Sequence, residues 1–355
     1  MTTINARSGD NCISGNHKPF SLILPALLLM ALLATTASSF AADAPQKGEC
    51  GTTDSFSGEL LNPGVNLGNI RPFRVFKNAS YGTGGVALRN RGAGGISISG
   101  VIAPVQAAYV YWAVIQPNKA ASVITMKRLF PGVAGPANLP GVVVGTGPVP
   151  CPWPGGQITV FRALIPAGIA IGNGLYEVSL LAGAGGAVNS SDPWTPPILL
   201  PLWEGASVVM VGQPSLVAHP GLVSIYDRGL AGGTFVSGVG LAYNLILPIA
   251  TPGNRTLIDN IGADGKHVFG ASRLAAPAFT SETTTIGAPP FAGPGSAYWD
   301  SDWNGSSGLP VPELWDDTGH DITALGAAVP NLPVTVSQPG GGDCLTPVVN
   351  VIEED

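Results

Sequence analysis

The stretch "AAYVYWAVIQ", residues 107–116, is apolar on both faces that a β-strand would present. Alternate residues of a strand point to opposite sides of its sheet. One face would carry Ala108, Val110, Trp112 and Val114, and the other Tyr109, Tyr111 and Ile115. A strand that is apolar on both faces is covered on both sides. The stretch therefore predicts a central strand in a layered β-protein.

Similar β-rich segments recur on both sides of this strand, such as "ITVFRALI" (158–165), "ASVVMVG" (206–212) and "LPVTVSQ" (332–338). The chain holds 49 glycines and 33 prolines, and only 11% of its residues are charged. Short strands with frequent turn residues favour antiparallel pairing. We therefore expect an all-β fold, an antiparallel, jelly-roll-like β-sandwich. Two arrangements stay open: one continuous domain, or lobes 42–250 and 251–355 divided near "LPIATPGNRT".

Residues 1–41 resemble an export signal. The apolar run "FSLILPALLLMALLATTA" (20–37) is followed by Ser39 and Ala41, small residues at the positions that signal peptidase reads. A membrane anchor is the alternative, but the run is shorter than the ~20 residues that span a bilayer and contains Pro25. We expect a mature bacterial protein beginning near Ala42, periplasmic, on the cell surface or extracellular, without a transmembrane segment.

The charged residues are unevenly distributed. No lysine or arginine follows Arg273, while residues 274–355 carry eleven carboxylates. Such a segment repels phosphate, so nucleic acid is not expected as a partner. Beyond the signal, the cysteines are Cys50, Cys151 and Cys344. In an exported protein they predict one disulfide and one free thiol, and we favour Cys50 with Cys344 over a bridge to Cys151.

Three of the strand-like segments resemble a known class of protein. "AYVYWAVI", "GASVVMVGQ" and "VSIYDRGL" are similar to the Tyr-Leu-Tyr-Trp, Gly-Ala-Ser-Leu-Val-Val-Val-Tyr and Leu-Tyr-Asp-Gly signatures of modules in exported bacterial cell-surface proteins. The resemblance implies a β-sandwich surface protein and no assigned catalytic residue. Gly212 and Gln213 depart from it, because they stand where the aromatic end of the Gly-Ala-Ser-Leu-Val-Val-Val-Tyr strand is expected.

Motifs of common enzymes are absent from the sequence, including the nucleophile elbow and the zinc-protease helix. A glycosidase requires two carboxylates facing a sugar. Glu204 and Glu313 are the candidates, because each lies close to a tryptophan, Trp203 or Trp315. In the alternative interpretation the tryptophans pack inside the sandwich and the carboxylates project into water.

The stretch "YWDSDWNGSSG", residues 298–308, is the best candidate for a ligand site. Asp300, Asp302 and Asn304 alternate before Gly305, as in calcium loops, and Glu313 would be a further ligand. The alternative is a polar turn, because the same residues form turns. Trp299, Trp303 and Trp315 would provide flat apolar surfaces for stacking on sugars.

Together these features predict a non-enzymatic surface or matrix protein that binds a polysaccharide or surface glycan, or associates with itself. Calcium is the one cofactor that the sequence suggests. A secreted carbohydrate-active hydrolase, with Glu204 and Glu313 as catalytic carboxylates, is the alternative function.

Overall fold

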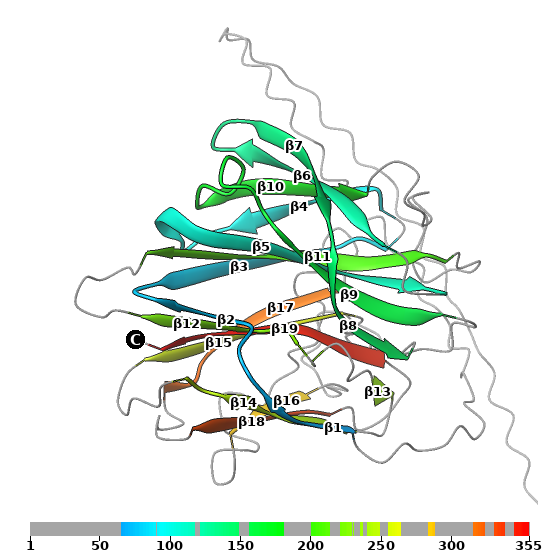
Figure 1. Ribbon diagram of the computed structural model, residues 1–355, viewed down its shortest axis with the longest axis vertical. Coiled ribbons are helices and arrows are strands. Elements are labelled where there is room, and N and C mark those ends of the chain that lie inside the picture. Colours follow the sequence, from blue (N-terminus) through cyan, green and yellow to red (C-terminus); the bar gives the residue numbers. More distant parts are fainter. Residues whose placement is uncertain are drawn as a thin grey trace, which may run out of the picture. The chain divides into compact units, whose positions relative to one another are not determined.

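The computed structural model is built almost entirely from β-strands (Figure 1). It describes residues 65–89, 91–117, 121–148, 156–180, 200–213, 221–228, 230, 235–236, 240–248, 255–263, 283–287, 315–323, 330–337 and 344–354. Within these ranges every strand pair is antiparallel except the parallel pair β1–β14. The predicted all-β, antiparallel sandwich class is confirmed. No helix in these ranges has the length and apolarity needed to cross a bilayer.

Four sheets carry most of the strands, and we number them I to IV. Sheet I has the order β4-β10-β6-β7, and sheet II has the order β3-β11-β5-β9-β8. The bounds in sheet I are Ala93–Ile98 (β4), Gly174–Leu180 (β10), Val123–Phe130 (β6) and Ala134–Pro140 (β7). Those in sheet II are Ser80–Ala87 (β3), Leu202–Gln213 (β11), Ile102–Gln116 (β5), Gln157–Leu164 (β9) and Val142–Pro148 (β8).

Sheet III has the order β17-β15-β19-β12-β2, and sheet IV has the order β1-β14-β18-β16. The bounds in sheet III are Trp315–Asp321 (β17), Thr256–Ala263 (β15), Cys344–Glu354 (β19), Leu222–Tyr226 (β12) and Arg74–Lys77 (β2). Those in sheet IV are Val65–Ile70 (β1), Gly240–Ile246 (β14), Asn331–Ser337 (β18) and Thr283–Ile286 (β16). The short strand β13 (Phe235–Val236) pairs with β19.

The sheets are layered in the order I, II, III, IV, with a hydrophobic core in each of the three spaces between them. Figure 1 shows the same succession from β7, β6, β10 and β4 down to β14, β16 and β18. Sheets II and III are therefore covered on both faces. Two sandwiches, I–II and III–IV, pack back to back.

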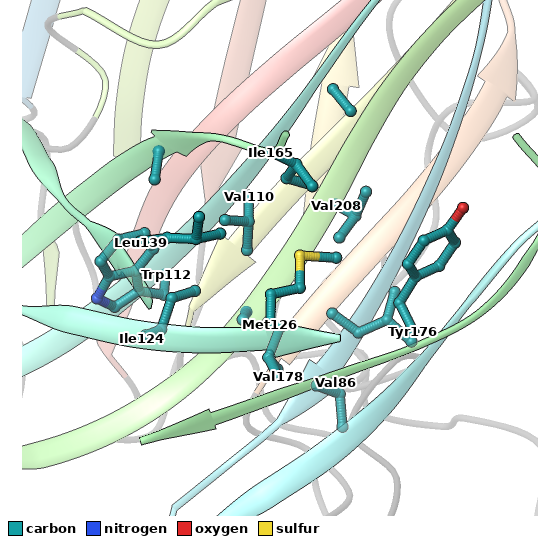
Figure 2. Close-up of a cluster of buried hydrophobic side chains, with 14 of the residues drawn as sticks. Val86, Val110, Trp112, Ile124, Met126, Leu139, Ile165, Tyr176, Val178 and Val208 are labelled. Carbon is teal, nitrogen blue, oxygen red and sulfur yellow. The ribbon is translucent and has the colours of Figure 1, made fainter. Parts of the chain in front are cut away.

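Strand β5 occupies the central position that its sequence predicts. The core between sheets I and II contains Ala108, Val110, Trp112 and Val114. The core between sheets II and III contains Tyr109, Tyr111 and Ile115. Trp112 has no exposed surface, stacks on Phe161 at a ring-centroid distance of 5.5 Å, and donates its indole N–H to Ser122 Oγ at 2.9 Å. Figure 2 shows this tryptophan among the aliphatic side chains of sheets I and II. The predicted burial of both faces is confirmed.

Sheets II and III meet at a tryptophan that lies over two glycines. A Cβ atom placed on Gly205 would lie 2.5 Å from Trp315 Cδ2, and one placed on Gly85 would lie 2.8 Å from Trp315 Cδ1. The indole N–H of Trp315 donates to Ser207 Oγ at 2.8 Å. The Gly-Ala-Ser part of "GASVVMV" therefore accommodates the indole ring, because two of its residues supply the space and the hydrogen-bond acceptor.

Residues 54–355 form one compact unit. Strands β2 and β12 of sheet III precede residue 250, whereas β15, β17 and β19 follow it. Sheet IV is mixed in the same way, because β1 and β14 precede β18 and β16 in the chain. The segments 42–250 and 251–355 thus contribute strands to the same two sheets.

Candidate functional site

A cleft of about 420 Å³ opens where one end of sheet II meets strand β2 of sheet III. Phe73 directly precedes β2 and Arg74 begins it. Tyr109 comes from β5, Arg162 and Leu164 from β9, and Val142 from the start of β8. Leu164 and Val142 are 62% and 60% exposed, so the cleft has apolar side chains open to solvent. Its size is typical of a site for a small ligand or for a few units of a polymer.

The inner part of the cleft is aromatic. The rings of Phe73 and Tyr109 meet edge to face, with centroids 5.7 Å apart and an interplanar angle of 81°. The guanidinium carbon of Arg162 lies 3.4 Å from the Phe73 ring centroid, a distance at which the cation is attracted to the ring. Phe73 is held in place from two sides and keeps part of its surface exposed.

Asp227 fixes the arginine of the cleft. This residue follows β12 in sheet III, has no exposed surface, and forms an ion pair with Arg162 of sheet II. The Tyr111 hydroxyl donates to Asp227 Oδ2 at 3.0 Å. Burial raises the pKa of Asp227 above its ordinary value, although the neighbouring Arg162 acts in the opposite direction. The pair thus links the two middle sheets behind the cleft and limits the orientations open to Arg162.

A second polar cluster lies between sheets II and III, on strands β3, β11, β15 and β17. Thr83 Oγ1 donates to Asp259 Oδ2 at 2.7 Å, and Ser207 Oγ donates to Asp317 Oδ2 at 3.0 Å. Burial, reinforced by the charge of Asp259, raises the pKa of Asp317 to about 7. Within the described ranges no three histidine, cysteine or acidic residues are arranged to hold a metal ion. The cluster is therefore a packed, hydrogen-bonded part of the sheet contact.

Two sequence-predicted site residues are described with their side chains, and both are buried. Glu204 has no exposed surface and forms an ion pair with Arg89, which is also buried. Trp315 packs over Gly205 and Gly85, so it presents no face to a sugar. Trp203 is buried as well, as in the packing interpretation. The expectation that Glu204 projects into water is wrong, because Arg89 compensates its charge inside the fold.

The other predicted site residues lie outside the described residues: Trp299, Asp300, Asp302, Trp303, Asn304, Glu313 and Cys50. For Cys344 the structure describes only the backbone, at the start of β19. The calcium loop and the Cys50–Cys344 disulfide therefore stay predictions.

The residues of the cleft were not predicted as a site. Phe73 and Arg74 belong to "RPFR" (71–74), where an aromatic residue lies between arginines, and this is the one local signal. Asp227 lies within "VSIYDRGL", where a charged residue directly follows a strand. Neither pattern indicates that the two segments meet, because β2 and β12 pair across more than a hundred residues.

Comparisons with known proteins give no relationship from which a function follows. No protein-family model and no curated protein matches the chain. Among solved structures, the CUB1-EGF-CUB2 domain of human MASP-1/3 is similar at 8% identity, over 77% of this chain and 98% of that chain, with a TM-score of 0.17. A likeness at this level carries no argument about function.

Proposed function

We propose that this chain is an exported, non-enzymatic protein of the cell surface or extracellular matrix that binds polysaccharide in the cleft around Phe73. The observation that carries the proposal is the cleft itself. It combines part of an aromatic ring with the exposed apolar side chains of Val142 and Leu164 and with the polar groups of Arg74 and Gln106. Sugar rings have flat C–H faces and a rim of hydroxyl groups, which match such a surface.

The size of the cleft favours a polysaccharide over a protein ligand. Stable protein interfaces bury about 800 Å² on each partner and are extended. A concave site of about 420 Å³ instead suits one or two sugar rings, with the rest of the polymer continuing outside it.

Binding without catalysis is the simpler interpretation of the acidic residues. Glycoside hydrolysis requires two carboxylates that contact the sugar. Asp227 is the acidic residue next to the cleft in the described part of the chain, and it is buried in an ion pair. Glu204 is enclosed in the same way. The ion pairs of Asp227 and Glu204 therefore favour a structural role for these two carboxylates over a catalytic one.

Titration calorimetry of the protein against a panel of soluble polysaccharides tests the proposal. Replacing Phe73 with alanine removes the aromatic surface, and we expect affinity for the bound polysaccharide to fall at least tenfold. Phe130→Ala is the matched control, because Phe130 is 67% exposed on sheet I and lies outside the lining of the cleft. A thermal melt of each variant verifies folding. Failure of every polysaccharide to bind, or an equal loss in both variants, would contradict the proposal.

A further inference from the structure

Two arginines lie at the cleft, and two further basic residues lie on or before strand β2. Arg74 lines the cleft, and the guanidinium carbon of Arg228 lies 5.9 Å from the Phe73 ring centroid. Arg71 and Lys77 lie just before and at the end of the same strand, β2, at the edge of sheet III. All four side chains are exposed.

These four charges differ from that of Arg162, which Asp227 neutralises. Among the described residues no carboxylate forms an ion pair with Arg71, Arg74, Lys77 or Arg228. The described residues that line the cleft include no acid. Among the described residues, cationic groups at the cleft thus outnumber acidic ones, although the whole chain has a formal charge of −6.

An exposed positive charge next to an aromatic surface selects for a ligand that carries both an apolar face and an anionic group. Arginine suits carboxylate and sulfate groups because its planar guanidinium donates two parallel hydrogen bonds to them. A neutral polysaccharide offers hydroxyl groups, which accept hydrogen bonds from arginine but carry no charge to neutralise it.

We propose that the ligand of the cleft is an acidic polysaccharide, with uronate or sulfate groups, whose charge is bound by Arg74 with Arg228 at the side of the Phe73 ring. This inference rests on the proposed function and specifies its ligand. Arg162 acts as a positioning residue: held by Asp227, it supports the Phe73 ring against which a sugar packs. Arg71 and Lys77 add positive charge on either side of Arg74 in the chain, although strand alternation places the Lys77 side chain on the opposite face of β2 from Arg74.

The test compares polymers that differ only in charge. Polygalacturonate is paired with its methyl ester, and dextran sulfate with dextran, and each is titrated calorimetrically into the wild-type protein at low salt and in 0.5 M NaCl. We expect at least tenfold tighter binding of the acidic member in one or both pairs, and weakening by salt because exposed charges are screened.

Two variants test whether the preference for acidic polymers arises at the cleft. Arg74→Gln should lower affinity for the acidic polymer about tenfold, while Lys127→Gln should not change it. Lys127→Gln is a suitable control because it also removes one positive charge, but from sheet I, away from the lining of the cleft. There Lys127 pairs with Glu177 at 2.7 Å. Equal effects of the two substitutions would mean that only the net charge matters and would overturn the site.

The remaining outcomes separate this inference from the function on which it rests. Equal binding of both members of each pair would overturn the acidic ligand and leave polysaccharide binding intact. Binding of no polysaccharide would overturn both. Poly-L-glutamate serves as an acidic chain without sugar rings. If it binds as tightly as the acidic polymers, and Arg74→Gln weakens it equally, then the ligand is not specifically a polysaccharide.

Discussion

Single residues in this protein join sheets that are distant in sequence. Asp227 binds Arg162 and Tyr111 across the contact between sheets III and II. Ser207 accepts the indole N–H of Trp315 and donates to Asp317. Buried polar groups are costly unless they are hydrogen-bonded, so each of these contacts favours one arrangement of the two middle sheets.

Asp317 should make the stability of the protein depend on pH. Its pKa is about 7 in the folded protein and near 3.8 in an unfolded chain. Between these values the native state keeps a proton that the unfolded state has lost, so the free energy of unfolding falls as pH rises from about 4 to about 7. The decrease for one such group is at most about 1.4 kcal/mol per pH unit. Urea denaturation at several pH values measures it.

The variant Asp317→Asn should reduce this pH dependence and raise stability at pH 8 relative to the wild type. A residual slope is expected, because burial also raises the pKa of Glu354 to about 7. Asp321→Asn is the control, since hydrogen bonds to Thr323 lower the pKa of this exposed carboxylate. An unchanged slope in Asp317→Asn would show that Asp317 does not hold the proton.

At the scale of single strands, glycines determine how closely β11 approaches β17. Gly205 lies in β11, and the Trp315 ring occupies the space that a side chain at this position would need. A bulge in the pairing of β11 with β5 lies between Trp203 and Gly205. The strand is thus buried from Leu202 to Gly212, and at Gly205 it has no room for a side chain.

We expect Gly205→Ala to destabilise the protein by about 1–3 kcal/mol, because the added Cβ would lie 2.5 Å from Trp315 Cδ2 and the ring would have to move. Gly95→Ala introduces the same atom on an exposed part of β4, where the nearest neighbour is 3.6 Å away. It should change the free energy of unfolding by less than about 0.5 kcal/mol. Chemical denaturation compares the two variants, and equal effects would contradict the packing argument.

Across the whole molecule, the two middle sheets depend on each other for burial. Strands β5 and β11 of sheet II are covered on one face by sheet I and on the other by sheet III. Sheet III takes β15, β17 and β19, three of the five strands in its main order, from the part of the chain after residue 250. The N-terminal part alone would therefore expose one apolar face of sheet II.

A fragment ending at residue 250 should not fold to the native state, because it lacks these three strands and much of the core between sheets II and III. Burial of apolar surface is the main stabilising contribution, and this fragment loses a large part of it. Near-ultraviolet circular dichroism and resistance to proteolysis, with residues 54–355 as the control, measure the outcome. A folded, protease-resistant fragment would show that 42–250 is an independent lobe.

The amino-acid sequence is sufficient to predict the all-β class and the central position of β5. The reason is local: alternation along one strand records which faces are apolar, and residues 108–115 are apolar on both. The same alternation favours the interpretation in which Trp203 packs inside the sandwich, and Trp203 is buried.

The residues that form the cleft, in contrast, are recognised from the folded chain and not from the sequence. Phe73, Tyr109, Arg162 and Asp227 are far apart in the chain and meet because β2 pairs with β12 and β5 with β9. The alternation of apolar and polar residues does not indicate which strands are neighbours. No single stretch of sequence therefore predicts the cleft. In the same way Glu204, beside a tryptophan in sequence, is paired with Arg89, 115 positions away. Pairing between distant strands depends on the fit of side chains across sheets, which no single strand specifies.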